Sequence, residues 1–407
     1  MFDISPEKYV RSGIPLVRVQ NIKNGMIDDS NMVYLSEEEH SMENKTELGD
    51  FDFVLSKIGT VGEVALLDPK HKKWNFSQNV IGIKLDKVKI SPSYILFFLL
   101  SKFGQLQIKR AEMGQVQAKL ELEDIRNLKI IRIEGEKIFN DYLVKILKSR
   151  SGSELFYKQA ENLLLEELGL KNLDVEENLS AIVNFSDILE ARRMDAEYFQ
   201  PKYENLLEVI KKKVKVAKLK DIANVKRGSL INPKFYSESG TPYLRGKDFS
   251  SGNLEKESLV YINDKFIPGN ETRVEVDDII FASIGSVGTL ALINNEFKDS
   301  FISNNTAKIS LIEKNYIVPD YFCMVLHSIV GKLQFEKEST QTAQPKISDS
   351  QVKNFMVPIL PIETQQKIAD LVRQSHEARK KAKELLEEAK RKVEEMIEKG
   401  GEKNGKI

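Results

Sequence analysis

The stretch Ser56-Lys-Ile-Gly-Thr-Val-Gly-Glu-Val-Ala-Leu66 recurs in the second half of the chain as Ala282-Ser-Ile-Gly-Ser-Val-Gly-Thr-Leu-Ala-Leu292. Towards the N-terminus, Gly13-Ile-Pro-Leu-Val-Arg18 matches Gly240-Thr-Pro-Tyr-Leu-Arg245. Four more pairs follow in the same order towards the C-terminus: Asn79 with Asn305, Pro92 with Pro319, Gly104 with Gly331, and Gln117-Ala-Lys119 with Gln344-Pro-Lys346. Equivalent residues of the two copies are separated by more than half the chain. So long a period indicates two copies of a globular module, because solenoid repeats run at about 20–50 residues.

Each module contains short β-branched stretches and longer apolar ones. The short stretches lie between Gly, Pro, Asn or Asp residues and predict strands. They cover residues 16–19, 51–55, 80–85, 278–281 and 307–311. The apolar runs at residues 94–103 and 321–331 are long enough for buried helices. Each module is therefore expected to be α+β.

A long segment of helical pattern follows each module. At residues 363–399, apolar and small residues recur every three or four positions among Lys, Arg and Glu, which predicts an amphipathic helix of about 55 Å that ends at Gly400-Gly401. The corresponding residues 136–170 are more polar and are interrupted at Ser151-Gly152-Ser153. We expect the two helices to pair antiparallel, although two independent surface helices would show the same pattern. The expected pairing positions are Val144, Leu147, Leu155, Leu165, Leu371, Ala378, Ala382, Leu385 and Ala389.

The composition limits the classes of function. The 407 residues include 61 Lys+Arg and 61 Asp+Glu, so any nucleic-acid binding must be local. One cysteine, Cys323, excludes an internal disulfide, and together with four scattered histidines it excludes a Cys/His zinc site within the chain. The N-terminus lacks a signal-peptide pattern, and no stretch approaches ~18 consecutive apolar residues. We expect a cytoplasmic protein without a membrane span.

The order of these motifs resembles that of the DNA-specificity subunit of type I restriction-modification systems. Each module has a Gly-x-Pro-x-x-Arg opening, a Gly-x-x-Gly loop and a Gln/Lys loop, and each is followed by a long helix, so the resemblance covers nearly the whole chain. Arg193-Met-Asp-Ala-Glu-Tyr-Phe199 and Pro361-Ile-Glu-Thr-Gln-Gln-Lys-Ile368 also look like pieces of that family. The resemblance implies two target-recognition domains, each reading one half of a split duplex DNA site. It also implies that the helices set the spacer and dock two methyltransferase subunits, with restriction/translocase subunits joining through the complex.

The expected fold is α+β, with two tandem repeated α+β target-recognition domains separated by two long antiparallel coiled-coil-like helices. The expected boundaries are residues 1–133 for the first target-recognition domain, 134–172 for the first helical region, 173–362 for the second target-recognition domain, and 363–407 for the second helical region and tail. Residues 173–233 have no counterpart, since the first copy begins near the equivalent of Lys234. The first domain is therefore expected to be N-terminally short.

Base readout needs particular side chains, with Gln and Asn binding adenine and Arg and Lys binding guanine. The repeated loops carry these types, and their glycines would let backbone amides approach a phosphate. The alternatives are a solvated loop, an arginine salt bridge within the domain, a plain tight turn, and Asx turns at the asparagines. The expected DNA contacts are Arg18, Gln20, Asn21, Lys57, Thr60, Asn79, Gln115, Gln117, Lys119, Arg245, Lys247, Ser283, Ser286, Asn304, Asn305, Gln341, Gln344 and Lys346.

A basic run lies ahead of the second module. Residues 211–227 contain eight lysines and arginines and one acid, Asp221, which favours either phosphate contacts with salt-dependent affinity or a solvated helix face. Two modules at opposite ends of a helical pair of ~50 Å would place half-sites roughly 10–15 bp apart. Because the two Gln/Lys loops differ, the half-sites should differ as well.

No catalytic motif has the surroundings that its chemistry needs. Asn232-Pro-Lys-Phe235 is similar to the Asn-Pro-Pro-Tyr/Phe box of amino-methyltransferases, but Lys replaces the second proline and no Gly-rich cofactor fingerprint accompanies it. We expect no catalytic residue, cofactor or metal, and catalysis in partner subunits. Two other classes stay open: an RNA-binding protein that clamps a backbone with its Gly-x-x-Gly turns, and a structural adaptor without duplex readout.

Overall fold

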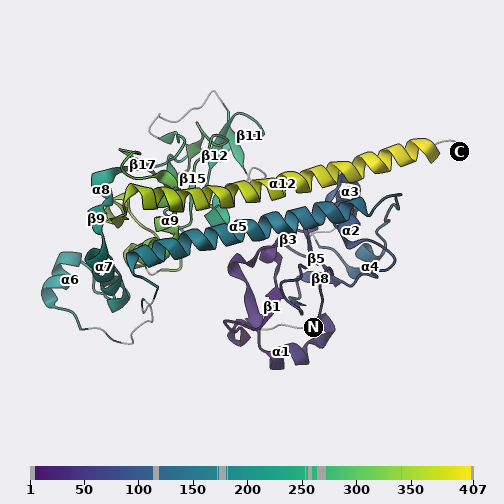
Figure 1. Cartoon of the computed structure of the whole chain (residues 1–407), viewed down its shortest axis with the longest axis horizontal. Helices are drawn as coiled ribbons and strands as arrows, with labels where there is room; N and C mark the ends of the chain where they lie inside the picture. Colours follow the sequence, from purple (N-terminus) through teal and green to yellow (C-terminus); the bar gives the residue numbers. More distant parts are fainter. Residues whose placement is uncertain are drawn as a thin grey trace. The chain divides into compact units, whose positions relative to one another are not determined.

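The chain divides into two compact units, and Figure 1 labels some of their helices and strands. The computed structural model describes residues 5–112, 119–171, 173, 180, 182–252, 254, 259–263, 272–340 and 342–404. Unit 1 comprises Met1–Gly152 with Glu377–Ile407, and unit 2 comprises Ser153–His376. The boundary cuts two long helices, so each unit contains one module and a part of each helix.

Unit 1 is built on two sheets. The five-stranded sheet has the order β2 (Ile22–Lys23), β3 (Gly25–Ile27), β6 (Val64–Leu66), β5 (Phe53–Ser56), β8 (Val80–Ile83), and the three-stranded sheet has the order β4 (Val33–Leu35), β1 (Ile14–Val17), β7 (Asn75–Phe76). The helices are α1 (Glu37–Met42), α2 (Pro92–Leu100), α3 (Lys102–Glu112) and α4 (Leu122–Arg126), with short 3-10 turns at Pro6–Lys8, Val19–Asn21, Asp29–Asn31 and Asn44–Thr46. Strands β5 and β6 are buried along their whole length and form a core with α2, because all three segments are apolar.

Three sheets are formed by the described residues of unit 2. Their orders are β10 (Ala223–Arg227), β17 (Thr306–Leu311), β14 (Ile279–Ala282), β15 (Leu290–Leu292); then β11 (Tyr236–Ser237), β13 (Val260–Ile262), β12 (Thr241–Leu244), β16 (Phe301–Ile302); and β18 (Met356–Ile359) with β9 (Lys215–Lys218). The helices are α6 (Phe185–Ala191), α7 (Pro201–Lys213), α8 (Leu219–Ile222), α9 (Pro319–His327), α10 (Ile329–Glu338) and α11 (Asp349–Val352), with 3-10 turns at Pro233–Phe235 and Gly246–Gly252. The main core joins α7, α9 and α10 to the β14–β17 sheet.

The repeat in the sequence is also a repeat in topology. Strand β1 pairs antiparallel with β4 and parallel with β7, and β12 pairs in the same two ways with β13 and β16. Strand β5 lies between β6 and β8, as β14 lies between β15 and β17. The predicted α+β class and the tandem duplication are therefore confirmed.

The described parts of the two modules differ at one sheet edge. In unit 2, β10 pairs with β17 over five residue pairs, Ala223↔Leu311 to Arg227↔Ala307. Strand β8, the equivalent of β17, stands at the end of its sheet order in unit 1. Strands β9 and β10 and helices α6 to α8 all come from the segment that the sequence comparison leaves without a counterpart.

Each predicted apolar helix is in fact a pair of helices. The run at residues 94–103 divides into α2 and α3 at Ser101, and the run at residues 321–331 divides into α9 and α10 at Ser328. Both serines have an extended backbone, which ends the preceding helix. In unit 2 the start of α10 lies so close to the end of α9 that a Cβ at Gly331 would clash with the Leu326 carbonyl oxygen. Apolar periodicity alone does not reveal such a break.

The two long helices are α5 (Ile138–Leu168) and α12 (Ile362–Asn404), and they pair antiparallel. In unit 1 the Tyr142 hydroxyl donates to the Glu388 carboxylate at 2.7 Å, and in unit 2 the hydroxyls of Ser153 and Ser375 lie 3.0 Å apart. The contact positions rise along α5 as they fall along α12. The predicted end at Gly400-Gly401 is wrong: α12 continues to Asn404, since a glycine costs a helix only about 1 kcal/mol.

Burial corrects the predicted pairing positions. Val144 and Leu155 have 62% and 55% of their surface exposed. Ala382 and Ala389 are buried as predicted, whereas Leu147, Leu165, Leu371, Ala378 and Leu385 are partly buried. The buried positions of α5 are Phe139, Leu143, Ile146, Ser153, Ala160, Leu164 and Leu168. Phe139 and Leu143 belong to the same core as α2, so packing on the module sets the rotation of α5.

Candidate nucleic-acid interface

In unit 1 the Gly-x-x-Gly turn lies against the end of the Gln/Lys loop. Ile58 and Lys119 form an antiparallel bridge, and the Leu120 amide donates to the Lys57 carbonyl at 3.1 Å. The Lys57 amide donates to the Asn79 carbonyl at 2.9 Å. Three blocks that are far apart in the sequence therefore meet at one edge of unit 1.

Unit 2 repeats this arrangement with different side chains. Ile284 and Lys346 form the antiparallel bridge, and the Ile347 amide donates to the Ser283 carbonyl at 3.0 Å. The Ser283 amide donates to the Asn305 carbonyl at 2.9 Å. The predicted loops are thus brought together in the same way in both copies.

The two glycines of each turn have different roles. Gly59, Gly62, Gly285 and Gly288 have φ values of 91°, 85°, 82° and 84°, a region that favours glycine. A Cβ at Gly62 would lie 2.5 Å from a side chain of α3, and one at Gly288 would lie 3.1 Å from a side chain of α10. Gly59 and Gly285 are exposed and have no such close neighbour. The second glycine is therefore explained by packing, while the first leaves its backbone facing solvent.

The arginine openings lie beside these turns. A Cβ at Gly59 would lie 3.8 Å from Val19, and one at Gly246 would lie 3.5 Å from Ala282.

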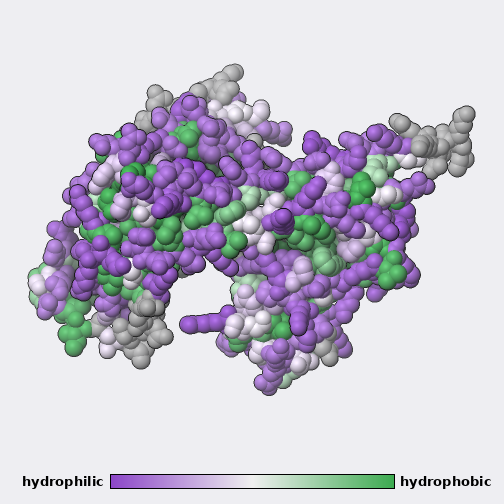
Figure 2. Space-filling model, viewed as in Figure 1, coloured by the Kyte–Doolittle hydropathy of each residue, from purple (hydrophilic) through white to green (hydrophobic). Residues whose placement is uncertain are grey.

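Figure 2 shows a mostly hydrophilic face on which hydrophobic residues form small groups. Of the predicted contacts, the exposed ones are Gln20, Thr60, Asn79, Lys247, Ser286, Asn305, Gln344 and Lys346, and the partly exposed ones are Lys57, Lys119 and Asn304. All of them offer hydrogen bonds or positive charge to a ligand.

An acid lies beside the two lysines of unit 1. Lys119 Nζ lies 2.6 Å from Glu121 Oε1, and Lys57 Nζ lies 3.9 Å from Glu121 Oε2. The hydrogen bond from Lys119 holds the pKa of Glu121 below its usual value. Sequence reasoning missed Glu121, although its place two residues after Lys119 was a signal. Glu121 would therefore compete with any anionic ligand for both lysines.

Burial corrects the prediction for Asn21 and Ser283. Asn21 is 1% exposed; its side chain accepts from the Arg18 amide at 3.1 Å and donates to the Asp28 carbonyl at 3.0 Å. Ser283 has no exposed surface, and its hydroxyl has no hydrogen-bond partner among the described residues. Neither side chain belongs to the interface, because neither reaches the surface.

Both opening arginines serve the fold. The Arg245 guanidinium binds Asp248 through two hydrogen bonds of 2.9 Å, and Asp248 is fully buried. Arg18 donates to the Asn31 carbonyl, and its guanidinium lies 5.9 Å from the centre of the Tyr9 ring. The alternative of a salt bridge within the domain describes Arg245, since a bidentate pair leaves its fork little capacity for a base. Gln115, Gln117 and Gln341 lie outside the described residues.

The basic run forms an exposed surface of unit 2. Lys211, Lys212 and Lys213 end α7, and the exposed lysines that follow are Lys215, Lys218, Lys220 and Lys226. Lys212 lies 3.6 Å from Glu208, an exposed pair that solvent screens. Arg227 instead binds Asp349 at 2.8 Å. Seven of the eight positive charges thus face solvent.

The described part of the chain shows neither a metal site nor a membrane span. Within it, no group of three or more His, Cys, Asp or Glu side chains is placed to hold a metal ion. No helix among the same residues combines the length and apolar character that crossing a membrane requires. Cys323 is buried, and burial raises the pKa of its thiol.

Comparison with known proteins gives one family for both modules. The sequence model of the family described as "Type I restriction modification DNA specificity domain" matches residues 3–132 and 211–391. A protein of Methanocaldococcus jannaschii, named as a putative type I restriction enzyme MjaX specificity subunit, is 28% identical over 163 residues. That match spans 39% of this chain and 38% of the relative.

Two solved structures match this chain at low similarity. The S subunit of a type I restriction-modification system from M. genitalium has a TM-score of 0.43 and 15% identity, with 97% of this chain and 90% of that chain covered. The HsdS subunit from Thermoanaerobacter tengcongensis has a TM-score of 0.33 and 14% identity, with 95% and 89% covered.

Proposed function

Because the chain belongs to the family of type I restriction-modification DNA specificity domains, we propose that it reads an asymmetric bipartite duplex DNA site, one half with each module. The observation that carries the proposal is the meeting of the same loops in both units, at Ile58–Lys119 and Ile284–Lys346. The side chains at equivalent positions differ, since partly exposed Lys57 of unit 1 corresponds to buried Ser283 of unit 2, which leaves no cation there. Different donors and acceptors read different bases. The two half-sites should therefore differ.

The proposed contacts divide between the modules. In unit 1 they are Gln20, Lys57, Thr60, Asn79 and Lys119, with Gln115 and Gln117 from the undescribed part of the loop. In unit 2 they are Lys247, Ser286, Asn304, Asn305, Gln344 and Lys346, with Gln341 from the undescribed position. Glutamine and asparagine supply bidentate contacts to adenine, and lysine supplies contacts to guanine or phosphate.

The subunits of this family are non-catalytic, so methylation and cleavage belong to partner subunits. We assign α5 and α12 the tasks of setting the spacer and docking two methyltransferase subunits, with restriction/translocase subunits joining through the complex. The two modules correspond to residues 1–133 and 173–362, and the helical regions to residues 134–172 and 363–407. Half-sites roughly 10–15 bp apart fit helices of this length. The assignment needs no cofactor or metal, and the location that we propose is the cytoplasm.

Selection from a randomised duplex library tests the proposed function. The full chain is used alone and with its methyltransferase subunit, at two salt concentrations. An asymmetric split motif is the expected result, because each module presents its own side chains. A single enriched half-site would refute bipartite reading. If no duplex is enriched, the adaptor is favoured; if no duplex is enriched and the same chain binds a single-stranded RNA in a separate titration, the RNA-binding alternative is favoured.

Removal of positive charge from the basic run should make DNA binding less sensitive to salt. We expect the triple variant Lys215→Gln, Lys218→Gln, Lys220→Gln to reduce the slope of log K against log salt by as much as about 0.9 for each phosphate that is no longer neutralised. Titration of a specific duplex at several salt concentrations measures the slope. The matched control changes Lys367, Lys380 and Lys381, exposed lysines of α12, to Gln. Equal slopes in both variants would mean that the run is a solvated face.

A further inference from the structure

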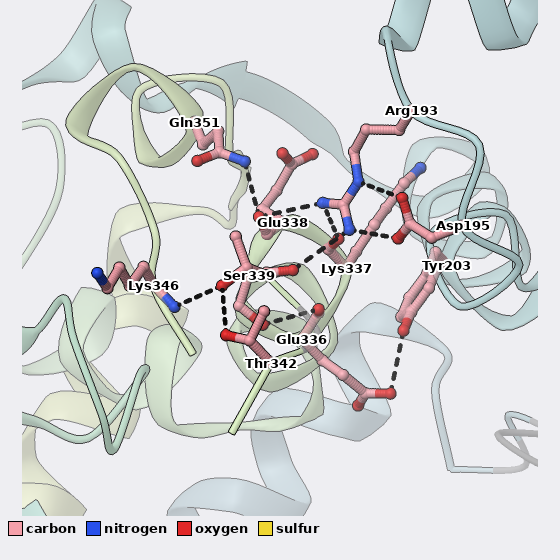
Figure 3. Close-up of polar contacts among 11 residues, drawn as sticks. Arg193, Asp195, Tyr203, Glu336, Lys337, Glu338, Ser339, Thr342, Lys346 and Gln351 are labelled. Atoms are coloured by element: carbon pink, nitrogen blue, oxygen red, sulfur yellow. Dashed lines mark hydrogen bonds and ion pairs between the residues drawn. The ribbon is translucent and has the colours of Figure 1, made fainter. Parts of the chain in front are cut away.

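The loop that carries Gln344 and Lys346 begins at the carboxyl end of α10, where Arg193 lies (Figure 3). We call residues 340–346 the reading loop; position 341 is outside the described residues. Arg193 Nη1 donates to the carbonyls of Lys337 at 3.1 Å and Glu338 at 3.3 Å, and Nη2 donates to that of Ser339 at 3.4 Å. The last carbonyls of a helix lack partners within the helix, and a cation there is favourable. Arg193 therefore caps the helix where the reading loop starts.

Asp195 and Tyr198 hold Arg193 in this position. Arg193 Nε donates to one carboxylate oxygen of Asp195 at 2.9 Å, and Nη2 donates to the other. Together with the three carbonyls, this uses all five N–H donors of the guanidinium. The Tyr198 ring centre lies 4.6 Å from the guanidinium carbon and 4.8 Å from Lys337 Nζ. The hydrogen bond from Arg193 holds the pKa of Asp195 below its usual value.

The far end of the reading loop is held by a second arginine. Arg227 Nη2 donates to the Ile347 carbonyl at 2.9 Å and to Asp349 at 2.8 Å. Gln351 Nε2 donates to the Glu338 carbonyl at 2.7 Å, which also accepts from Arg193. The far end of the loop is thus tied to β10 through Arg227, and α11, which follows the loop, is tied to the end of α10 through Gln351.

The described part of the loop is closed upon itself and tied to the Gly-x-x-Gly turn. The Thr340 amide donates to the Lys346 carbonyl, and the Lys346 amide donates to the Thr340 hydroxyl, each at 3.0 Å. The Gly285 amide donates to the Pro345 carbonyl at 2.9 Å. A displacement at either end must therefore move Gln344 and Lys346 together with the turn.

We propose that Arg193 and Arg227 are positioning residues for the second half-site, which hold the ends of the reading loop so that Gln344 and Lys346 meet the duplex in a fixed orientation. The DNA-reading part of this inference rests on the proposed function. Neither arginine belongs to the repeated blocks, and both come from the segment without a counterpart in the first copy. One task of that segment is then to brace the second module.

The test combines hydrogen exchange with half-site binding in the full chain. Arg193→Ala should speed amide exchange at Thr340, Lys346 and Gly285 at least tenfold, and weaken selection of the second half-site by about tenfold, the size expected for a single base contact. Selection of the first half-site should stay unchanged. Arg193→Lys keeps the charge but lacks the fork, so it should remain defective.

Two controls separate positioning from direct DNA binding and from general loss of charge. Arg192→Ala removes the exposed neighbouring arginine and should change neither measurement. Gln344→Ala should weaken second half-site selection without faster exchange at Thr340 or Gly285, because its side chain is exposed. Arg227→Ala should behave as Arg193→Ala does, since it frees the other end of the loop.

Either of two outcomes for Arg193→Ala would overturn the inference. Wild-type exchange in the reading loop would show that Arg193 does not hold it, and equal losses at both half-sites would show general destabilisation. If the unaltered chain selects no duplex, the proposed function and the DNA-reading role fail together. The exchange comparison between Arg193→Ala and Arg192→Ala still decides whether the loop is held.

Discussion

Duplication of residues 146–152 in α5 together with residues 377–383 in α12 is expected to move the preferred DNA target to one whose spacer is about 3 bp longer, because seven helical residues add about 10 Å and ten base pairs span about 34 Å. Both duplications lie at the boundary between the two units and preserve the heptad spacing of the positions at which α5 and α12 pair. Affinity for the original spacer should fall at least about 100-fold. A shift of a few base pairs misplaces one half-site, and each mismatch costs about 1–3 kcal/mol.

The measurement is duplex binding across a series of spacers with both half-sites held constant. The bases selected at each half-site should stay the same, because no loop residue is changed. The matched control is Val144→Ala with Leu155→Ala, which alters the exposed side of α5 and should leave the spacer unchanged. Equal affinity of the lengthened chain for the original and the longer spacer would refute the proposal that α5 and α12 set the spacer length.

Ala389→Glu should lower the free energy of unfolding of unit 1 by about 3 kcal/mol or more, since it buries an unpaired carboxylate. Ala389 has no exposed surface and packs in the core that contains Leu143, Ile146 and Val393. Urea unfolding followed by circular dichroism measures the loss. Selection of the first half-site should weaken with it, because that module shares the same core.

The matched control for this substitution is Lys381→Glu, which places the same side chain on the exposed side of α12. It should change the free energy of unfolding by no more than about 0.5 kcal/mol. An Ala389→Glu chain as stable as the control would show that the helix pair does not close the core of unit 1. The two independent surface helices would then be the better description.

Much of the fold could be predicted because duplication is a property of the order of residues. The blocks around Gly59 and Gly285 predict two α+β modules, and the pattern at residues 363–399 predicts the long helix α12. The rotation of the long helices about their own axes, which decides which residues face the core, was predicted less well. Leu147 fits a heptad as well as Ile146 does, and only packing on the core around Phe139 decides that Ile146 is buried and Leu147 only partly buried.

The candidate interface was likewise predicted in part from the sequence and decided in part by the tertiary structure. The sequence alone determined which loops would recur as pairs, since Lys119 and Lys346 occupy equivalent places in the two copies. Only the tertiary structure decided which side chains remain available: Asn21 satisfies buried backbone groups and Arg245 binds buried Asp248. The physical reason is that the groups that read a base edge are also those that satisfy a buried carbonyl or carboxylate. Which partner each group meets depends on chain segments brought close by folding, as Arg193 is brought to the end of α10.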